Sequence, residues 1–424
     1  MFQTLANAWK VPELRKKILY TILLLVVFRF GSIIPVPGLA KDALAGLVAD
    51  GSTLFGFMNT ISGGAFGNAT IFAMSITPYI NSSIIMQLLT IAIPALERLS
   101  KEGEEGRKKI ATYSRYLTVV LAFIQAAGLY AALQGAVAET NFLSFVTITL
   151  TFTAGTTFLM WLGEKITDLG VGNGISLIIF VGIISRADDG VMVLFNYMQG
   201  KMFSFMSIVA VVLFIILAIA IVGFVVVINA GERRIPVQYA KRVVGRKMYG
   251  GQSTHIPLKV CMAGVMPIIF AMSILAFPAT IVQLFNANPT GFWGGFLKLF
   301  SPDSWVYAII YFMLIIFFTY FYTSIQFNPI EMANNMKANG GFVPGIRPGR
   351  TTSDYIAKIL SRVTLIGAIA LGIVAIIPIV LSNVTSMNIG IGGTSILIVV
   401  SVALETVNQL ESQMLMRHYK GFLD

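Results

Sequence analysis

The chain has 424 residues, a formal net charge of +11 and a mean hydropathy of +0.81; 56% of its residues are hydrophobic and only 12% are charged. No soluble globular domain needs so much apolar surface, so the composition excludes an ordinary soluble protein and indicates one that crosses a membrane several times. A single cysteine excludes an intrachain disulfide, and two histidines leave little for metal chemistry.

Apolar segments of spanning length follow one another along the chain, since a transmembrane helix takes about 20 apolar residues. We expect ten of them, at residues 18–36, 70–93, 116–135, 145–163, 175–185 with its continuation, 205–229, 260–286, 305–327, 359–381 and 393–413. The basic residues concentrate in alternate connections, so the positive-inside rule places both termini in the cytoplasm. The fold class expected is an all-α integral membrane protein with ten transmembrane helices.

Charged residues are scarce inside these spans, and the clear candidates are Arg29 and Glu405. Ion-coupled carriers usually place charged groups near the membrane midplane. Arg29 lies near the outer end of the first span, where its side chain can snorkel to the interface. Glu405 is explained by a helix contact or a wet vestibule, and both explanations outweigh an ion-coupling site.

The segment 54–68, LFGFMNTISGGAFGN, is half apolar and broken by four glycines. It is too short and too broken to span a bilayer alone. Irregular backbone at membrane depth is tolerated only where protein or a wet cavity surrounds it. A short helix folded back into the protein from the outer side fits the pattern, and so does an external loop.

The next span carries a stripe that changes from apolar to polar at helical spacing, through Ile76, Ile80, Ser83 and Gln87. A polar stripe against lipid is costly, so this face is expected to look into the protein or a wet cavity. Pro78 is expected to interrupt the helix one turn in.

Two connections, 230–259 and 329–358, are much longer and more basic than a helix hairpin needs. The first is expected to add a strand or hairpin, because Ile235-Pro-Val-Gln-Tyr and Arg246-Lys-Met-Tyr flank glycine. The second has Asn, Gly and Pro punctuation around Arg347 and Arg350. Basic arms suit the phosphates of a ribosome or an acidic protein surface, while charge facing anionic lipid is the simpler alternative.

No motif in the chain points to covalent chemistry. We find no HExxH, GxSxG, Walker loop or cysteine cluster. No catalytic residue, metal or cofactor is therefore expected, and the protein is not expected to be an enzyme. The rival class is a secondary transporter with an inverted repeat, which shares ten spans and broken helices but usually has charged groups at the midplane.

Several motifs, in collinear order, closely resemble the bacterial SecY family. They are Gln252-Ser-Thr-His-Ile-Pro-Leu-Lys259, Ala263-Gly-Val-Met-Pro267, Phe342-Val-Pro-Gly-Ile-Arg-Pro-Gly349, Ser62-Gly-Gly-Ala65, Lys101-Glu-Gly-Glu104, Met160-Trp-Leu-Gly-Glu164 and Gly172-Asn-Gly-Ile-Ser176. The resemblance implies the central subunit of a protein-conducting channel. Residues 1–200 and 201–424 are then two inverted five-helix halves around an hourglass pore, which opens sideways to lipid.

The resemblance also implies roles for particular residues. The pore ring carries over to Ile76, Ile80, Ile179, Ile269 and Ile398. The plug carries over to residues 55–68, with Phe57, Ile61, Gly63, Gly64, Phe66 and Asn68. The lateral gate carries over to Gln87 and Phe277, between the second and third spans and the seventh and eighth. Docking of a motor or ribosome carries over to Arg242, Arg246, Lys247, Arg347 and Arg350.

The partners implied by the resemblance are the small membrane subunits SecE and SecG, the SecA ATPase, the ribosome, signal sequences with unfolded polypeptides, and anionic lipids. The implied location is the bacterial cytoplasmic membrane. The chain departs from the pattern at Gly67-Asn68, where some members have a basic residue, so a plug salt bridge is not expected here.

Overall fold

The computed structural model describes residues 8–40, 44, 54–132, 137, 140–200, 205–239, 242–244, 247–249, 253–262, 264–285, 304–385 and 393–420. Its helices are α2 (Pro12–Gly31), α4 (Leu54–Ile61), α5 (Thr77–Ala92), α6 (Pro94–Lys101), α7 (Glu104–Ala132), α8 (Phe142–Leu169), α9 (Gly174–Ile184), α10 (Ala187–Gly200), α11 (Phe205–Ala230), α12 (Met266–Phe285), α14 (Trp305–Gln326), α15 (Pro329–Ala338), α16 (Arg350–Thr385) and α17 (Gly393–Lys420). Its strands are β1 (Glu232–Tyr239), β2 (Arg242–Val244), β3 (Lys247–Tyr249), β4 (Ser253–Lys259) and β5 (Gly341–Phe342).

Each of the ten segments expected to cross the membrane overlaps a helix. By length and composition, six of the described helices can cross: α7, α8, α11, α14 with α15, α16 and α17. The bent pair α5 and α6 makes a possible seventh, while α9 and the described part of α12 are shorter apolar helices. The helix α2 is not among them, and three basic residues lie in its first turns. Length and composition alone therefore do not establish the count of ten.

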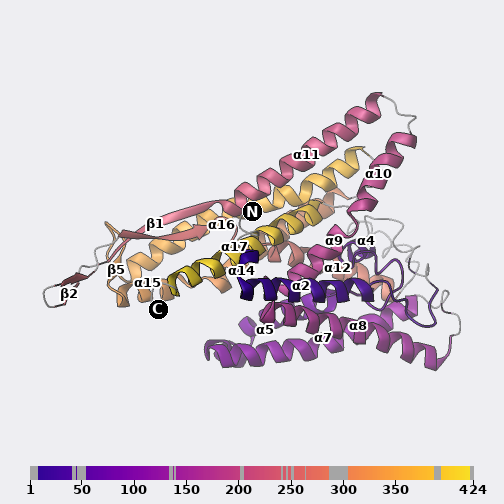
Figure 1. Cartoon of the computed structure of the whole chain (residues 1–424), viewed down its shortest axis with the longest axis horizontal. Helices are drawn as coiled ribbons and strands as arrows, with labels where there is room; N and C mark the ends of the chain where they lie inside the picture. Colours follow the sequence, from indigo (N-terminus) through magenta and orange to yellow (C-terminus); the bar gives the residue numbers. More distant parts are fainter. Residues whose placement is uncertain are drawn as a thin grey trace.

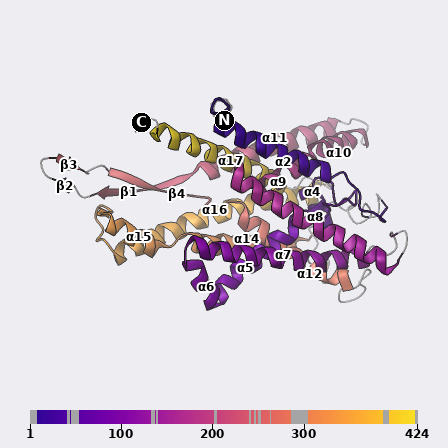
Figure 2. The ribbon, with the colours of Figure 1, turned by 60° about the horizontal axis from the view of Figure 1, so that its bottom comes forward.

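The helices form two groups with α9 and α12 between them (Figure 1). In the first group α7 packs against α5 and α8, and in the second α14 packs against α12 and α16 while α11 packs against α17. Contacts of α9 with α17, and of α12 with α5 and α7, join the two groups. The strands β1 and β4 project away from the helices at one end of the molecule (Figure 2).

The expectation that Pro78 interrupts the second span was wrong. Residues 71–76 form turns, and α5 begins at Thr77 with Pro78 in its first turn. Proline is favoured there because the first N–H groups of a helix have no intrahelical partner. The helix ends before Pro94, where Ile93 is extended, and α6 turns away by 100°. Proline thus sets both ends of α5.

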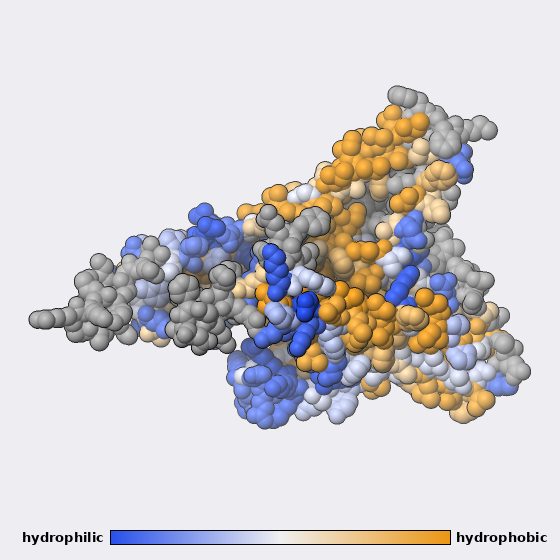
Figure 3. Space-filling model, viewed as in Figure 1, coloured by the Kyte–Doolittle hydropathy of each residue, from blue (hydrophilic) through white to orange (hydrophobic). Residues whose placement is uncertain are grey.

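The largest core cluster draws buried aliphatic residues from α2, α5, α8, α9, α11, α12, α14, α16 and α17. Apolar residues also cover much of the outside, and Figure 3 shows them along α11, while hydrophilic residues gather toward the end that bears the hairpin. On α11, Leu213, Ile219 and Val227 are more than 60% exposed. Such a continuous apolar exterior is stable in hydrocarbon and not in water.

Candidate pore, plug and docking arm

The five residues expected to form the pore ring lie on four helices and in one buried cluster. Ile76 caps the start of α5 and Ile80 lies one turn later, while the others lie on α9, α12 and α17. All five belong to the largest core cluster, and none is more than 6% exposed: Ile76, Ile80, Ile179, Ile269 and Ile398. Two helices from each half of the chain therefore contribute branched aliphatic side chains to one buried region.

The segment after the first span contains a short helix, α4, and folds into the protein. Ile61 and Phe66 are buried, whereas Asn68 is exposed; Phe57 lies on α4, but its side chain is outside the described part. Gly63 and Gly64 have φ of +66° and +85°, a region that glycine enters without strain. The α4 helix contacts α9 and α12. This agrees with the folded-back alternative and not with an external loop.

The helices expected to form the lateral gate lie against one another, since α12 contacts both α5 and α7. Gln87 on α5 is half-buried, and its Oε1 accepts no hydrogen bond from the residues that the structure describes. Phe277 lies on α12, with its side chain outside the described part. The apolar end of the α5 stripe is buried and its polar end is half-buried, so this face looks into the protein as expected.

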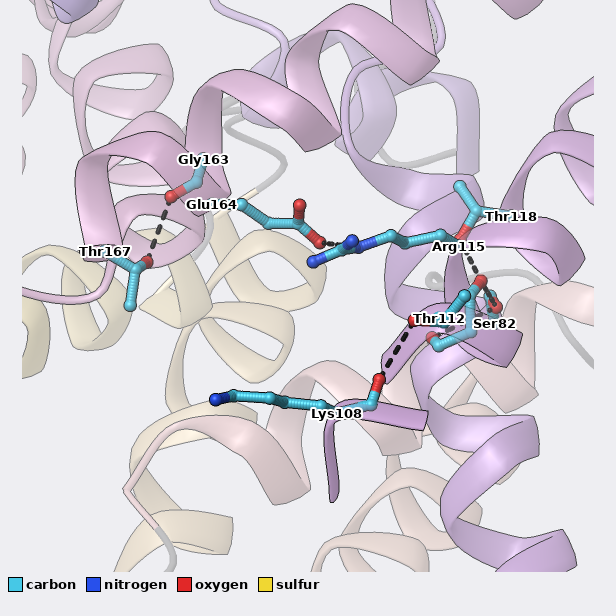
Figure 4. A network of polar contacts seen from close by, with 9 residues as sticks. Ser82, Lys108, Thr112, Arg115, Thr118, Gly163, Glu164 and Thr167 are labelled. Atoms are coloured by element: carbon cyan, nitrogen blue, oxygen red, sulfur yellow. Dashed lines mark hydrogen bonds and ion pairs between the residues drawn. The ribbon is translucent and has the colours of Figure 1, made fainter. Parts of the chain in front are cut away.

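Polar contacts fix α5, α7 and α8 as a group (Figure 4). Ser82 on α5 donates to the carbonyl of Ser114 on α7 at 2.6 Å, in a buried position. The next residue on α7, Arg115, pairs with Glu164 on α8 at 2.7 Å, and Figure 4 shows the two side chains extended toward each other. Hydrogen bonds to a charged partner are stronger than neutral ones. These bonds tie α5, which carries Ile76 and Ile80, to α7, and α7 to α8.

The loop 230–259 forms the hairpin that the sequence predicted. Strands β1 and β4 pair antiparallel, with Ile235 opposite Ile256, and β2 pairs with β3 near the tip. The edge of β1 also pairs with β5 from the second basic loop, with Gln238 opposite Phe342. The two loops therefore make one unit, the docking arm, which comprises β1 to β5, α15 and the loop that runs on to Arg350. Its strands form a three-stranded sheet, β4-β1-β5, and a two-stranded sheet, β2-β3.

Exposed cations of the docking arm include Arg347 and Arg350, which stand before and at the start of α16. The carbonyl of Arg347 accepts a hydrogen bond from the Thr352 hydroxyl at 2.8 Å, which fixes the backbone of its loop. Arg242 lies on β2 and Lys247 on β3, while Arg246 lies outside the described residues. The arm thus carries exposed cations near the start of α16, and two further basic residues lie on the strands near its tip.

Comparisons with known proteins decide the family. The SecY family model matches residues 70–407. Protein translocase subunit SecY of Halalkalibacterium halodurans is 46% identical over 434 residues, covering 100% of both chains. The subunit of the same name from Streptomyces galbus is 44% identical over 444 residues, again covering 100% of both. The chain belongs to the SecY family.

Solved SecY and Sec61 channels share the fold. One, described as the structure of a protein conducting channel, superposes with a TM-score of 0.68 at 20% identity and covers 96% of each chain. Sec61 in the canine ribosome-channel complex gives a TM-score of 0.64 at 19% identity, also over 96% of each chain. At identities this low, the superpositions show a shared fold and nothing more.

Membership of the SecY family confirms two predictions from the sequence. The motif resemblance was to this family, and a family of translocase channel subunits is not one of enzymes. The family and the apolar helices together make this a multi-pass membrane protein. Within the described part of the SecY-family chain, no group of three or more His, Cys, Asp or Glu residues could hold a metal ion.

Sequence reasoning missed the structural role of Arg29. Its side chain does more than extend toward an interface, because Nη1 donates to the carbonyl of Gly63 and to the hydroxyl of Ser185. The signal in the sequence was a lone arginine near the end of an apolar span, ahead of a glycine-rich segment. The partners could not be read from the sequence, because Ser185 is 156 residues away.

Proposed function

We propose that this chain forms the central pore through which unfolded secretory polypeptides cross the bacterial cytoplasmic membrane. The observation that carries the proposal is the convergence of five isoleucines from α5, α9, α12 and α17 in one buried cluster. Residues 1–200 and 201–424 would be the two inverted halves of an hourglass with ten spans, and both termini would lie in the cytoplasm.

A ring of branched aliphatic side chains suits passage without binding. Such a constriction excludes water and ions when empty, because hydrophobic constrictions gate by dewetting. Flexible side chains can fit around a passing chain, and they offer it no hydrogen-bonding partner. An ion-selective filter would instead use carbonyl or charged groups, and a secondary transporter would need a polar midplane site.

Sideways release of apolar segments is favoured by the difference between lipid and water as solvents. A segment of about 20 apolar residues is more stable in lipid than in a wet pore, whereas a polar segment continues outward. The contact of α12 with α5 and α7 is the place where we propose that the wall opens. Gln87 and Phe277 would line this gate, and residues 55–68 would plug the pore at rest.

Movement of the polypeptide needs energy from a partner, which we propose is the SecA ATPase or the ribosome. Arg242, Arg246, Lys247, Arg347 and Arg350 would contact it. Their positive charge favours association with acidic protein or RNA phosphate. SecE and SecG would complete the membrane complex, and anionic lipid would face the basic cytoplasmic surface.

Crosslinking of a stalled precursor tests the pore directly. Photoreactive probes replace Ile80, Ile179, Ile269 or Ile398 in vesicles supplied with SecA and ATP, and a stalled secretory precursor is added. We expect adducts at all four positions, because the ring surrounds the chain. A probe at Ile148, buried in a different cluster on α8, is the matched control and should give none.

Two outcomes contradict the pore. Adducts confined to the docking arm would make the protein a docking receptor without a conducting path. If adducts formed at Ile148 as often as at the ring positions, the probes would be reacting nonspecifically within the helices.

A further inference from the structure

Arg29 connects three segments that are distant in sequence. It lies in the last turn of α2, and its Nη1 donates to the Gly63 carbonyl at 3.0 Å and to Ser185 Oγ at 3.1 Å. Gly63 follows α4, and Ser185 is the C-terminal cap of α9. The guanidinium is therefore close to the carboxyl ends of two helices, where the helix dipoles favour a positive charge.

The backbone beside this arginine makes unusually close contact with α9. A Cβ atom at Gly182 would lie 2.1 Å from the Ile61 carbonyl oxygen, and one at Gly63 would lie 2.6 Å from Ser185 Oγ. Both glycines are required for this approach, because any side chain would force the segments apart. The segment 58–70 thus rests on α9 through backbone atoms, with Arg29 at the contact.

The segment 58–70 is also bonded within itself. The Asn59 side chain accepts a hydrogen bond from the Gly67 N–H at 2.8 Å, and the Ser62 hydroxyl accepts one from the Phe66 N–H at 3.1 Å. The Thr70 hydroxyl donates to the Ala65 carbonyl at 3.0 Å. These local bonds do not involve Arg29, and they join residues only a few positions apart. We therefore expect them to open more often once the contact with α9 is lost.

We propose that Arg29 is a latch, a positioning residue that holds segment 58–70 against α9 in the closed channel. Its single Nη1 bonds both sides of the contact, the Gly63 carbonyl on the segment and the Ser185 hydroxyl on α9. Hydrogen bonds from a charged donor are stronger than neutral ones. Opening the channel then requires both bonds to break. The effect on the channel depends on the proposed function; the effect on the segment does not.

Amide hydrogen exchange in the purified protein tests the latch without any transport. In Arg29→Met, we expect the amides of residues 62–67 to exchange about tenfold faster, since a charge-assisted hydrogen bond that holds the segment is lost. Arg29→Lys keeps a donor and should restore most of the protection. Lys16→Met removes an exposed cation from the same helix, and it should exchange like the unchanged protein.

Ser185→Ala is the second variant, because it keeps the arginine and removes one acceptor. We expect an intermediate increase of about threefold in the same amides. Exchange like that of the unchanged protein in both Arg29→Met and Ser185→Ala would overturn the latch. If Arg29→Met does not fold, Ser185→Ala alone decides the outcome.

Halide leak through empty vesicles links the latch to the channel. Arg29→Met vesicles should leak more than those with Lys16→Met when no precursor is present. If Arg29→Met exchanges faster but the unchanged protein transports no precursor, the proposed function is contradicted and the latch stands. If the unchanged protein transports precursor normally but Arg29→Met exchanges no faster, the latch is contradicted and the proposed function stands.

Discussion

At the scale of single residues, glycines determine how closely the segments of this protein approach. Gly155 on α8 faces the turns that precede α5, and a Cβ atom there would lie 2.0 Å from the Ile71 carbonyl oxygen. Gly223 on α11 has no neighbour within 4 Å of the same atom. Both glycines lie within apolar helices, but only Gly155 is in close contact with another segment.

Gly155→Ala is expected to destabilise the protein by about 2 kcal/mol, because the added methyl group forces α8 away from the backbone at Ile71. Gly223→Ala is the matched control, and it is expected to leave stability unchanged or raise it by up to about 1 kcal/mol through better helix propensity. Thermal unfolding in detergent measures both variants. Equal midpoints would contradict the close contact.

At the scale of elements, the two basic loops fold together into the docking arm. Its small core contains Val237 of β1 and Leu258 of β4 with Met336 and Val343 of the second loop and Ile356 of α16. Val237 is buried and its neighbour Gln238 is exposed, since side chains alternate along a strand. Each loop alone lacks the partner that buries its apolar face.

Val237→Asp is expected to destabilise the docking arm by about 3 kcal/mol, because a carboxylate would be buried without a partner. The arm would then open more often, and limited proteolysis within residues 232–259 would speed up while the membrane helices stay intact. Gln238→Asp introduces the same carboxylate on the exposed side. Cleavage of both variants at equal rates would argue against a shared core.

At the scale of the whole molecule, the two halves meet at α9 with α17 and at α12 with α5 and α7. The five isoleucines proposed as the pore ring lie on helices of this junction, while the docking arm projects from one end (Figure 2). A partner at the arm would therefore sit at one end of the proposed path through the protein.

Arg347→Glu is expected to abolish motor-driven secretion, because it replaces a positive charge that would attract an acidic partner with a negative charge that would repel it. The fold should stay intact, because the side chain is exposed. Lys109→Glu makes the same change on α7, outside the docking arm, and should retain most secretion. Precursor transport into vesicles measures the activity, and thermal unfolding checks the fold. Normal secretion by Arg347→Glu would refute the docking role.

The sequence predicted the features that depend on local patterns. Every expected apolar segment overlaps a helix, and the hairpin at 230–259 was confirmed. Pro78 was assigned wrongly because proline both breaks helices and begins them, and the sequence alone did not distinguish the two. The roles of the ring, gate and docking residues stay predictions.

Length, hydropathy and charge by themselves determined that this protein crosses a membrane, because the cost of burying polar backbone and charge in lipid acts on each segment separately. Only the tertiary structure decided that segment 58–70 folds inward, that the two loops form one arm, and that Arg29 bonds Gly63 and Ser185. These features arise from packing between residues far apart in the chain, and a local pattern does not specify which distant surfaces will meet.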